Sequence, residues 1–216
     1  MNAPHPDFLP ALPPLTPHPP VGSVPRINTS ALQLPTAVDA GFAGLVFSED
    51  EPFFRSCDPS PLPDPQWLAV SGHGAGLIGL TAAHIQQSDA WRAWMSGNVA
   101  FDGVTPYASV YAGHQFGVFV PRLGDGRALN LGAMGGWELQ LKGAGPTPYA
   151  RFADGRAVLR SSIREFLCSE AMHALGIPTT HVLSLIGSPQ PVLRESVETA
   201  AIVCRMAPSF VRFGTF

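Results

Sequence analysis

The feature that most constrains this chain is a regular alternation, between residues 117 and 206, of short apolar runs with glycine-rich turns. One stretch in this region, residues 156–175, has apolar side chains at helical spacing, and Gly176 and Pro178 supply the signals that end a helix. Short apolar runs separated by glycines are typical of antiparallel strands joined by tight turns. The pattern therefore predicts an α+β domain in which an antiparallel sheet carries one main helix.

Several strands are expected on either side of this helix. Residues 118–120 and 128–131 are predicted to form a hairpin around the turn Gly124-Asp125-Gly126. A Gly135-Gly136 turn then leads into residues 137–142, whose apolar and polar side chains alternate with the period of a half-buried strand. Three further short strands are expected after the helix, at residues 181–186, 191–193 and 200–206.

The chain before residue 109 has a different texture. Residues 1–25 contain nine prolines, and we interpret residues 1–36 as a proline-rich, disordered leader. Residues 37–108 are interpreted as an N-terminal extension with short helices, including one that Ser88 caps and Gly97 ends. Residues 109–216 then form the α+β domain.

Composition excludes several classes of protein. The net charge is −3 and only 13% of the residues are charged, so the basic footprint of a nucleic-acid-binding protein is missing. The uncharged stretch at residues 66–88 contains His73, His84, Gln86, Gln87 and four glycines, which argues against a membrane helix. Cys57, Cys168 and Cys204 are far apart and form no zinc or disulfide pattern, so a reducing, cytoplasmic setting is expected.

Lys142 is the only lysine among thirteen basic residues, and it ends the strand at residues 137–142. A glycine-rich turn, a strand lysine and a helix glutamate that holds the lysine make up the phosphate-binding arrangement of protein kinases. Glu165 on the predicted helix is the candidate glutamate, and Glu170 is a competing partner. The order of elements is accordingly that of a nucleotide-binding small lobe. For each motif a purely structural reading also stays open, such as a plain turn or a solvated glutamate.

Other candidates for chemistry are weaker. The arginines between residues 151 and 164 fit either phosphate ligands or an exposed helix face. Arg205 and Arg212 suit phosphate by their fork geometry, although each taken alone fits a surface position. His114 fits a general base less well than a structural histidine.

Six blocks of the sequence closely resemble the selenoprotein O family. They are YAGHQFG at residues 111–117, LGDGR at 123–127, LKGAGPTPY at 141–149, DGRAVLRSSIRE at 154–165, GIPTT at 176–180 and RMAPS at 205–209. The resemblance implies a protein-kinase-like fold and transfer of AMP, with UMP as a second possibility in bacterial members, to Ser, Thr or Tyr hydroxyls of proteins. This chain would supply the small lobe and the N-terminal extension, with the large lobe missing.

The same resemblance assigns roles to individual residues. Glu165 would position Lys142. The expected nucleotide-binding residues are Gly124, Gly126, Arg127, Lys142, Asp154, Gly155, Arg205 and Arg212. The general base and the ligands for Mg²⁺ or Mn²⁺ would lie beyond Phe216, so no catalytic or metal-binding residue is expected in this chain.

The expected ligand is ATP, and the expected partners are protein substrates and a chain carrying the large lobe. Nucleic acid and membrane partners are not expected. Two alternatives remain open, namely a non-catalytic nucleotide-binding module and a structural remnant that needs a partner to cover its exposed core.

Overall fold

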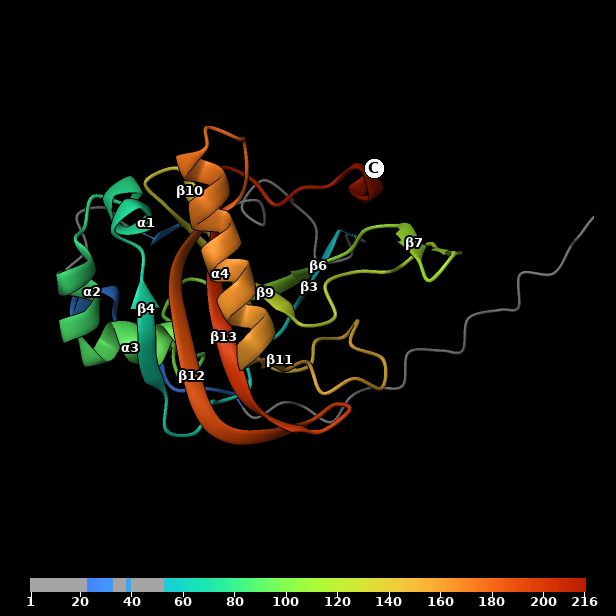
Figure 1. Ribbon diagram of the computed structural model, residues 1–216, viewed down its shortest axis with the longest axis horizontal. Helices are drawn as coiled ribbons and strands as arrows, with labels where there is room; N and C mark the ends of the chain where they lie inside the picture. The colour runs from blue at the N-terminus through green and yellow to red at the C-terminus, as the bar shows by residue number, and fades with distance from the viewer. Residues whose placement is uncertain (1–22, 33–37, 40–52) are drawn as a thin grey trace, which may run out of the picture.

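The computed structural model describes residues 23–32, 38–39 and 53–216 (Figure 1). One antiparallel sheet dominates it. Its strands follow the order β3 (Phe54–Ser56), β6 (Tyr107–Ser109), β9 (Ala128–Met134), β10 (Trp137–Lys142), β13 (Val197–Ala207), β12 (His181–Leu193) and β4 (Gln66–Val70). Two short strands join it at the side, β2 (Val38–Asp39) on β9 and β11 (Ala157–Val158) on β13. The predicted α+β fold with a mostly antiparallel sheet is confirmed.

The longest helix of the described residues is α4 (Leu159–Ala174), which lies along β12 and β13 on one face of the sheet (Figure 1). Three short helices follow β4, namely α1 (Gly72–Leu77), α2 (Ala82–Gln87) and α3 (Asp89–Met95). Ser88 caps α3 through its side chain, as predicted, and Gly97 follows the helix with a positive φ of 71°. None of the described helices is both long and apolar enough to cross a membrane.

The centre of the sheet is buried on both faces, and the alternation along β13 shows how. Ala201 and Val203 point to α4, where they pack with Phe166. Their neighbours Ile202 and Cys204 point to the opposite face and join the larger core, which includes Trp91 and Trp94 of α3. Because successive side chains of a strand face opposite sides, one strand supplies both cores. A polar residue on such a central strand is therefore held in a fixed position.

The predicted hairpin around Gly124-Asp125-Gly126 is wrong. Residues 118–120 do form a strand, β8 (Val118–Val120), but it pairs with β7 (Gly113–Gln115) across the turn at Phe116 and Gly117. This small hairpin stands away from the main sheet (Figure 1). β9 pairs instead with β10, through the predicted Gly135-Gly136 turn, whose φ values are 58° and 80°. Two residues at positive φ match the turn to the twist of the strands.

The two strands predicted at residues 181–186 and 191–193 are one continuous strand, β12. Gly187, Ser188 and Pro189 interrupt the pairing register with β13 without ending the strand, because a bulge tolerates a proline that cannot donate a ladder hydrogen bond. The helix also buries fewer apolar residues than its spacing indicated. Phe166 is buried, whereas Leu167 and Leu175 are 60% and 73% exposed. Gly176 and Pro178 follow the helix end as expected.

The N-terminal segment contributes to the fold. Of the expected leader, residues 1–22 and 33–36 lie outside the described residues. The rest contains β1 (Arg26–Ile27), paired in parallel with β5 (Ala100–Phe101), and the 3₁₀ turn η1 (Thr29–Leu32), whose Leu32 is fully buried. β3, β4 and β6 of the expected extension lie in the same sheet as β9 to β13, so residues on both sides of position 108 share one sheet. A second 3₁₀ turn, η3 (Phe213–Thr215), lies near the C-terminal end.

Candidate functional site

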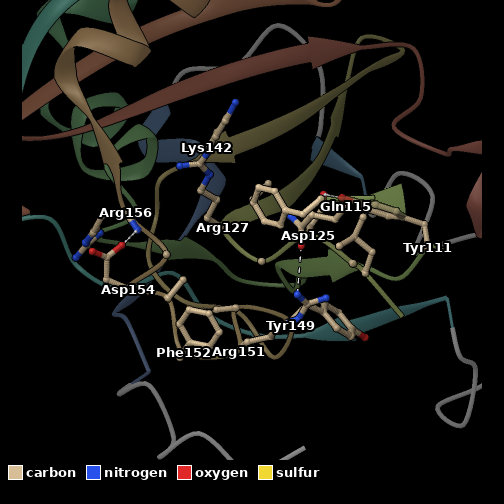
Figure 2. Close-up of a pocket in the computed structure, with 18 of the residues that line it drawn as sticks. Tyr111, Gln115, Asp125, Arg127, Lys142, Tyr149, Arg151, Phe152, Asp154 and Arg156 are labelled. Carbon is tan, nitrogen blue, oxygen red and sulfur yellow. Dashed lines mark hydrogen bonds between the residues drawn. The ribbon is translucent and has the colours of Figure 1, made fainter. Parts of the chain in front are cut away.

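A cavity of about 580 Å³ opens between the end of β10, the loop before β9 and the loop that precedes α4 (Figure 2). All eight expected nucleotide-binding residues line it: Gly124, Gly126, Arg127, Lys142, Asp154, Gly155, Arg205 and Arg212. They come from five separate places in the sequence, so the fold brings them together. A smaller hollow of about 400 Å³ lies beside it, and Arg127 and Lys142 border both.

The cavity is strongly cationic although the chain carries a net charge of −3. Six arginines and Lys142 line it, against two carboxylates, those of Asp125 and Asp154. Arg127 is exposed and Lys142 is partly exposed, so both cations are accessible to a ligand. A concave surface lined by one sign of charge attracts ligands of the opposite sign. The charge distribution therefore fits an anionic ligand with several negative charges.

Lys142 is held by Glu165. Its Nζ lies 2.6 Å from Oε2 of Glu165, and both side chains are about three-quarters buried, with exposed fractions of 27% and 23%. The other oxygen of Glu165, Oε1, lies 3.5 Å from a guanidinium nitrogen of Arg205 on β13. The competing partner Glu170, which sequence left open, instead accepts a hydrogen bond from Ser71 at 2.9 Å. One carboxylate thus positions two cations at the wall of the cavity.

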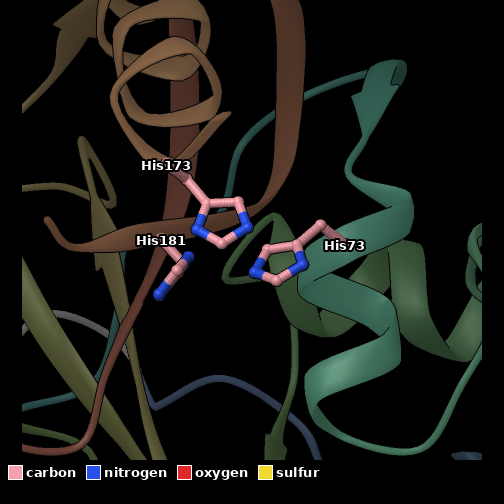
Figure 3. A group of neighbouring side chains, drawn as sticks. All are labelled: His73, His173 and His181. Atoms are coloured by element: carbon pink, nitrogen blue, oxygen red, sulfur yellow. The ribbon is translucent and has the colours of Figure 1, made fainter. Parts of the chain in front are cut away.

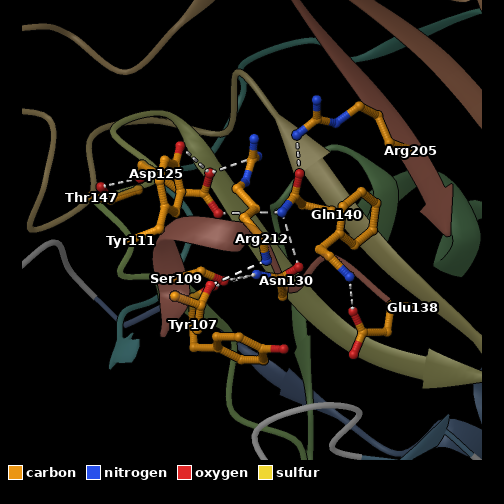
Figure 4. A network of polar contacts seen from close by, with 12 residues as sticks. Tyr107, Ser109, Tyr111, Asp125, Asn130, Glu138, Gln140, Thr147, Arg205 and Arg212 are labelled. Carbon is orange, nitrogen blue, oxygen red and sulfur yellow. Dashed lines mark hydrogen bonds and ion pairs between the residues drawn. The ribbon is translucent and has the colours of Figure 1, made fainter. Parts of the chain in front are cut away.

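A row of polar side chains crosses three neighbouring strands and ends at Arg205 (Figure 4). Asn130 of β9, Gln140 of β10 and Arg205 of β13 are direct register partners. Arg205 donates a hydrogen bond to Oε1 of Gln140, and Nε2 of Gln140 donates to Asn130 at 3.0 Å. Gln140 is fully buried and Asn130 is 1% exposed, so these bonds satisfy groups that water cannot reach. The row fixes the guanidinium of Arg205.

Asp125 connects this row to Arg212. Its Oδ1 lies 3.3 Å from a guanidinium nitrogen of Arg212 and accepts a hydrogen bond from the Tyr111 hydroxyl at 3.1 Å. The Arg212 guanidinium also stacks over the Tyr111 ring, 4.5 Å from its centre. Burial raises the pKa of Asp125, while Arg212 opposes that rise. Burial, and then the Asp125 charge, raise the pKa of Tyr111 to about 12, so the phenol stays protonated and donates.

The glycines of the loop before β9 have a packing role that sequence did not indicate. A Cβ at Gly124, whose φ is 59°, would lie 2.4 Å from Cγ of Tyr149. A Cβ at Gly126 would lie 3.1 Å from the Tyr149 carbonyl oxygen. Because these two positions have no side chain, Tyr149 can pack closely against the loop. Gly155 plays a similar part, since a Cβ there would lie 2.0 Å from the carbonyl carbon of Gly145.

Asp154 is neutralised by an arginine that sequence reasoning did not single out. Its two oxygens lie 2.9 and 2.7 Å from the two terminal nitrogens of Arg194, in the parallel geometry that suits a carboxylate. The hydrogen bond from Arg194 is the main cause that lowers the pKa of Asp154. The neighbouring Arg156 is 7% exposed and donates to the carbonyl oxygens of Ser60 and Pro61, so it anchors the chain before β4.

Sequence reasoning missed Asp125, Gln140, Tyr149 and Arg194 as parts of this site. Of these four, only Gln140 could have been predicted from sequence, because the polar residues of the alternating strand at residues 137–142 all lie on one face. That alternation predicted solvent on the polar face. Glu138 and Gln140 are instead 6% and 0% exposed. The N–H of Phe210, in the chain after β13, donates to Glu138, and the side chains of Asn130 and Arg205 enclose Gln140.

The two carboxylates of the cavity do not fit a magnesium or manganese site. Mg²⁺ takes oxygen ligands in an octahedral shell, usually one or two free carboxylates with water and substrate phosphate. Asp125 is committed to Arg212 and Tyr111, and Asp154 to Arg194. These two carboxylates therefore offer no free ligand to a metal ion.

Comparison with known proteins identifies the family to which this sequence is similar. The sequence model described as protein adenylyltransferase SelO matches residues 38–216. The chain is 54% identical over 183 residues to protein nucleotidyltransferase YdiU of Thiobacillus denitrificans, a match that covers 82% of this chain and 36% of that relative. It is 49% identical over 210 residues to the protein of the same name from Cupriavidus metallidurans, with 94% and 37% covered.

A third relative of that name, from Myxococcus xanthus, is 57% identical over 163 residues, covering 73% of this chain and 33% of the relative. The chain thus spans about a third of the length of the curated relatives it matches. The family match covers all eight cavity residues predicted from sequence together with Glu165. On this evidence the chain belongs to the protein adenylyltransferase SelO family.

Proposed function

We propose that the cationic cavity binds the phosphates of ATP and that this chain is the nucleotide-binding part of a protein nucleotidyltransferase. The observation that carries the proposal is the cluster of Lys142, Glu165 and Arg205, in which one helix carboxylate holds two cations at the cavity wall. A strand lysine held by a helix glutamate is the arrangement by which protein kinases neutralise nucleotide phosphates. We accordingly infer a kinase-like small lobe, with α4 as its single long helix.

The chain's own residues would bind and orient the nucleotide. Lys142 has three N–H donors and donates one of them to Glu165, so two remain for phosphate oxygens. Arg127 is exposed at the junction of the two hollows, where it would contact a second phosphate. Arg212, which stacks over Tyr111, also lines the cavity. Positioning and charge neutralisation of this kind are the main contributions of a protein to phosphoryl-type transfer.

The reaction we infer is transfer of AMP to a protein hydroxyl. The oxygen of a Ser, Thr or Tyr side chain forms a bond to the α-phosphorus, the bond from that phosphorus to the bridging oxygen breaks, and pyrophosphate leaves. The hydroxyl proton passes to a general base, which we place outside this chain together with the ligands for Mg²⁺ or Mn²⁺. UTP would enter the same phosphate site, with UMP as the transferred group. The three free cysteines agree with action in the reducing cytoplasm.

The first test is nucleotide binding by the purified chain, measured by isothermal titration calorimetry with ATP. We expect Lys142→Ala to weaken binding by about tenfold or more, equivalent to roughly 1.4 kcal/mol. Lys142→Arg should restore it only in part, because a planar fork does not reproduce a compact ammonium beside Glu165. Arg92→Ala is the matched control, since Arg92 pairs with Asp89 on α3 and does not line the cavity. Equal affinity of Lys142→Ala and wild type would refute the phosphate assignment.

A second test separates transfer from binding. The chain is incubated with α-labelled ATP and Mg²⁺ or Mn²⁺, alone and with a chain carrying the remaining two thirds of a relative. Label on protein supports nucleotidyl transfer, and label only in the mixture supports a partner large lobe. Binding of ATP without label in either sample supports the alternative, a non-catalytic nucleotide-binding module.

A further inference from the structure

Three histidines that are far apart in sequence meet outside the cationic cavity (Figure 3). His73 comes from α1, His173 from the last turn of α4, and His181 from the first position of β12. One ring nitrogen of each lies within 4.8 Å of those of the other two. None of the three lines either hollow of the cationic site. The fold therefore builds a second cluster of chemically active side chains at a separate place.

Among the residues that the structure describes, no hydrogen bond explains the cluster as a purely structural group. Nε2 of His73 is buried and has no hydrogen-bond partner among the described residues. A buried polar nitrogen left unpaired carries a desolvation cost, so a missing partner at this position needs an explanation. The ring of His73 instead stacks on that of His173, with centres 3.8 Å apart, and His181 lies 4.9 Å from both.

The surroundings of the three imidazoles include the carboxylate of Glu170. A neutral imidazole has a free lone pair on one nitrogen and is therefore ready to bind a metal. Glu170 lies one turn before His173 on the same face of α4, where Ser71 holds its carboxylate. A held carboxylate next to metal-binding imidazoles is the usual outer-shell partner of such sites.

We propose that His73, His173 and His181 bind one divalent transition-metal ion, with Zn²⁺ as the best fit. Imidazole nitrogen suits Zn²⁺, Cu²⁺ and Ni²⁺, and three histidines leave one position of a zinc tetrahedron open to water. The rings of His73 and His173 lie 19° from parallel, and a metal ion binds in the plane of each ring. Binding therefore turns the exposed His173 about its side-chain bonds until its nitrogen faces the ion. The unpaired Nε2 of His73 then gains a partner.

The ion would connect three elements that the chain brings together only by folding. It would tie the C-terminal turn of α4 to α1 and to the start of β12. Because α4 also carries Glu165, the proposed site would restrain the helix that positions Lys142. The proposal nevertheless rests on the histidines alone and holds whether or not the cavity binds ATP.

The test uses the 216-residue chain, freed of metal with a chelator and without a polyhistidine tag. Zn²⁺ is titrated by calorimetry, and Co²⁺ is added in parallel because a tetrahedral nitrogen site gives it strong visible absorption. Wild type is expected to bind one Zn²⁺ per chain. Loss of an outer-shell partner already weakens metal sites by roughly 10–100-fold, so His173→Ala should weaken binding by at least about that factor. His173 is exposed, so this variant keeps the fold.

His114→Ala is the matched control, because His114 is an exposed histidine on β7 that takes no part in the cluster. His5 and His18, which lie outside the described residues, are present in every variant and cannot cause a difference between them. A second readout is thermal unfolding, whose midpoint Zn²⁺ should raise in wild type and His114→Ala but not in His173→Ala. Absence of Zn²⁺ binding in wild type would overturn the proposal, and so would equal binding by His173→Ala.

Discussion

Glu165 is the residue whose replacement tests the site most directly. Glu165→Gln removes the charge that Lys142 and Arg205 share but keeps the size of the side chain. The new amide can still accept from Lys142 through its oxygen, while its NH₂ group would face the donors of Arg205. Lys142 and Arg205 then lose the charge that they share at the cavity wall. We expect the folded state to lose stability although no cavity is created.

The magnitude follows from the distances. At an effective dielectric constant of about 20, unit charges 2.6 and 3.5 Å apart attract by roughly 6 and 5 kcal/mol. Desolvation of three mostly buried charges offsets the larger part of this attraction. The net loss is expected to be that of a charged hydrogen bond, about 1.5–3 kcal/mol. For a chain of this length that corresponds to a fall of roughly 3–12 °C in the unfolding midpoint.

The assay is urea unfolding, monitored by the fluorescence of the four tryptophans. Wild type and variant are compared with the same dependence of the unfolding free energy on urea concentration. Glu170→Gln is the matched control on the same helix. Its carboxylate accepts a hydrogen bond from the neutral Ser71 hydroxyl, and an amide oxygen can accept the same bond. We expect that variant to lose less than about 1 kcal/mol. If both variants lose the same amount, the reasoning that Glu165 carries two cations is refuted.

Three further outcomes are expected. Gly155→Ala should lower the free energy of unfolding by about 3 kcal/mol or more, since its φ is 68° and the added Cβ would lie 2.0 Å from a backbone carbon of the preceding loop. Cys168 should react with an aromatic disulfide reagent in the native protein. Cys204 should react only on unfolding, because it is fully buried and burial raises its pKa to about 12. Arg194→Gln should cost up to about 1 kcal/mol at neutral pH, as measured by urea unfolding. Because the folded-state pKa of Asp154 is below its ordinary 3.8, this contribution is present above pH 3.8 and is lost as the pH falls through the folded value.

Each of these has a result that would count against it. Gly136→Ala is the control for the first, since Gly136 has a φ of 80° but nothing within 4 Å of an added Cβ. It should lose only the backbone strain of about 1–2 kcal/mol, and an equal loss at Gly155 would disprove the crowding argument. Fast modification of Cys204 in the folded protein would show that β13 opens readily. A difference between Arg194→Gln and wild type that persists in acid would show that the arginine acts through packing.

Local patterns in the sequence were sufficient for much of the fold. The Gly135-Gly136 turn, the strand that ends on Lys142 and the end of α4 just before Gly176 all depend on residues within a few positions of one another. The hairpin around Gly124-Asp125-Gly126 was wrong for an instructive reason. Its glycines pack against Tyr149, Gly124 against the ring and Gly126 against the backbone, a contact that lies more than twenty positions away in sequence. In sequence, a glycine-rich tripeptide that forms a turn cannot be distinguished from one that makes room for a neighbouring side chain.

The sequence by itself determined that an antiparallel sheet carries one long helix, and that a lone lysine ends one of its strands. Only the tertiary structure decided that Glu165, and not Glu170, meets Lys142, and that Gln140 lies opposite Arg205. The physical reason is that strands and helices have side-chain periods of 2 and 3.6 residues, which a short stretch of sequence is enough to reveal. Strand order and register, which bring residues from β9, β10 and β13 into one row, arise from packing across the whole sheet.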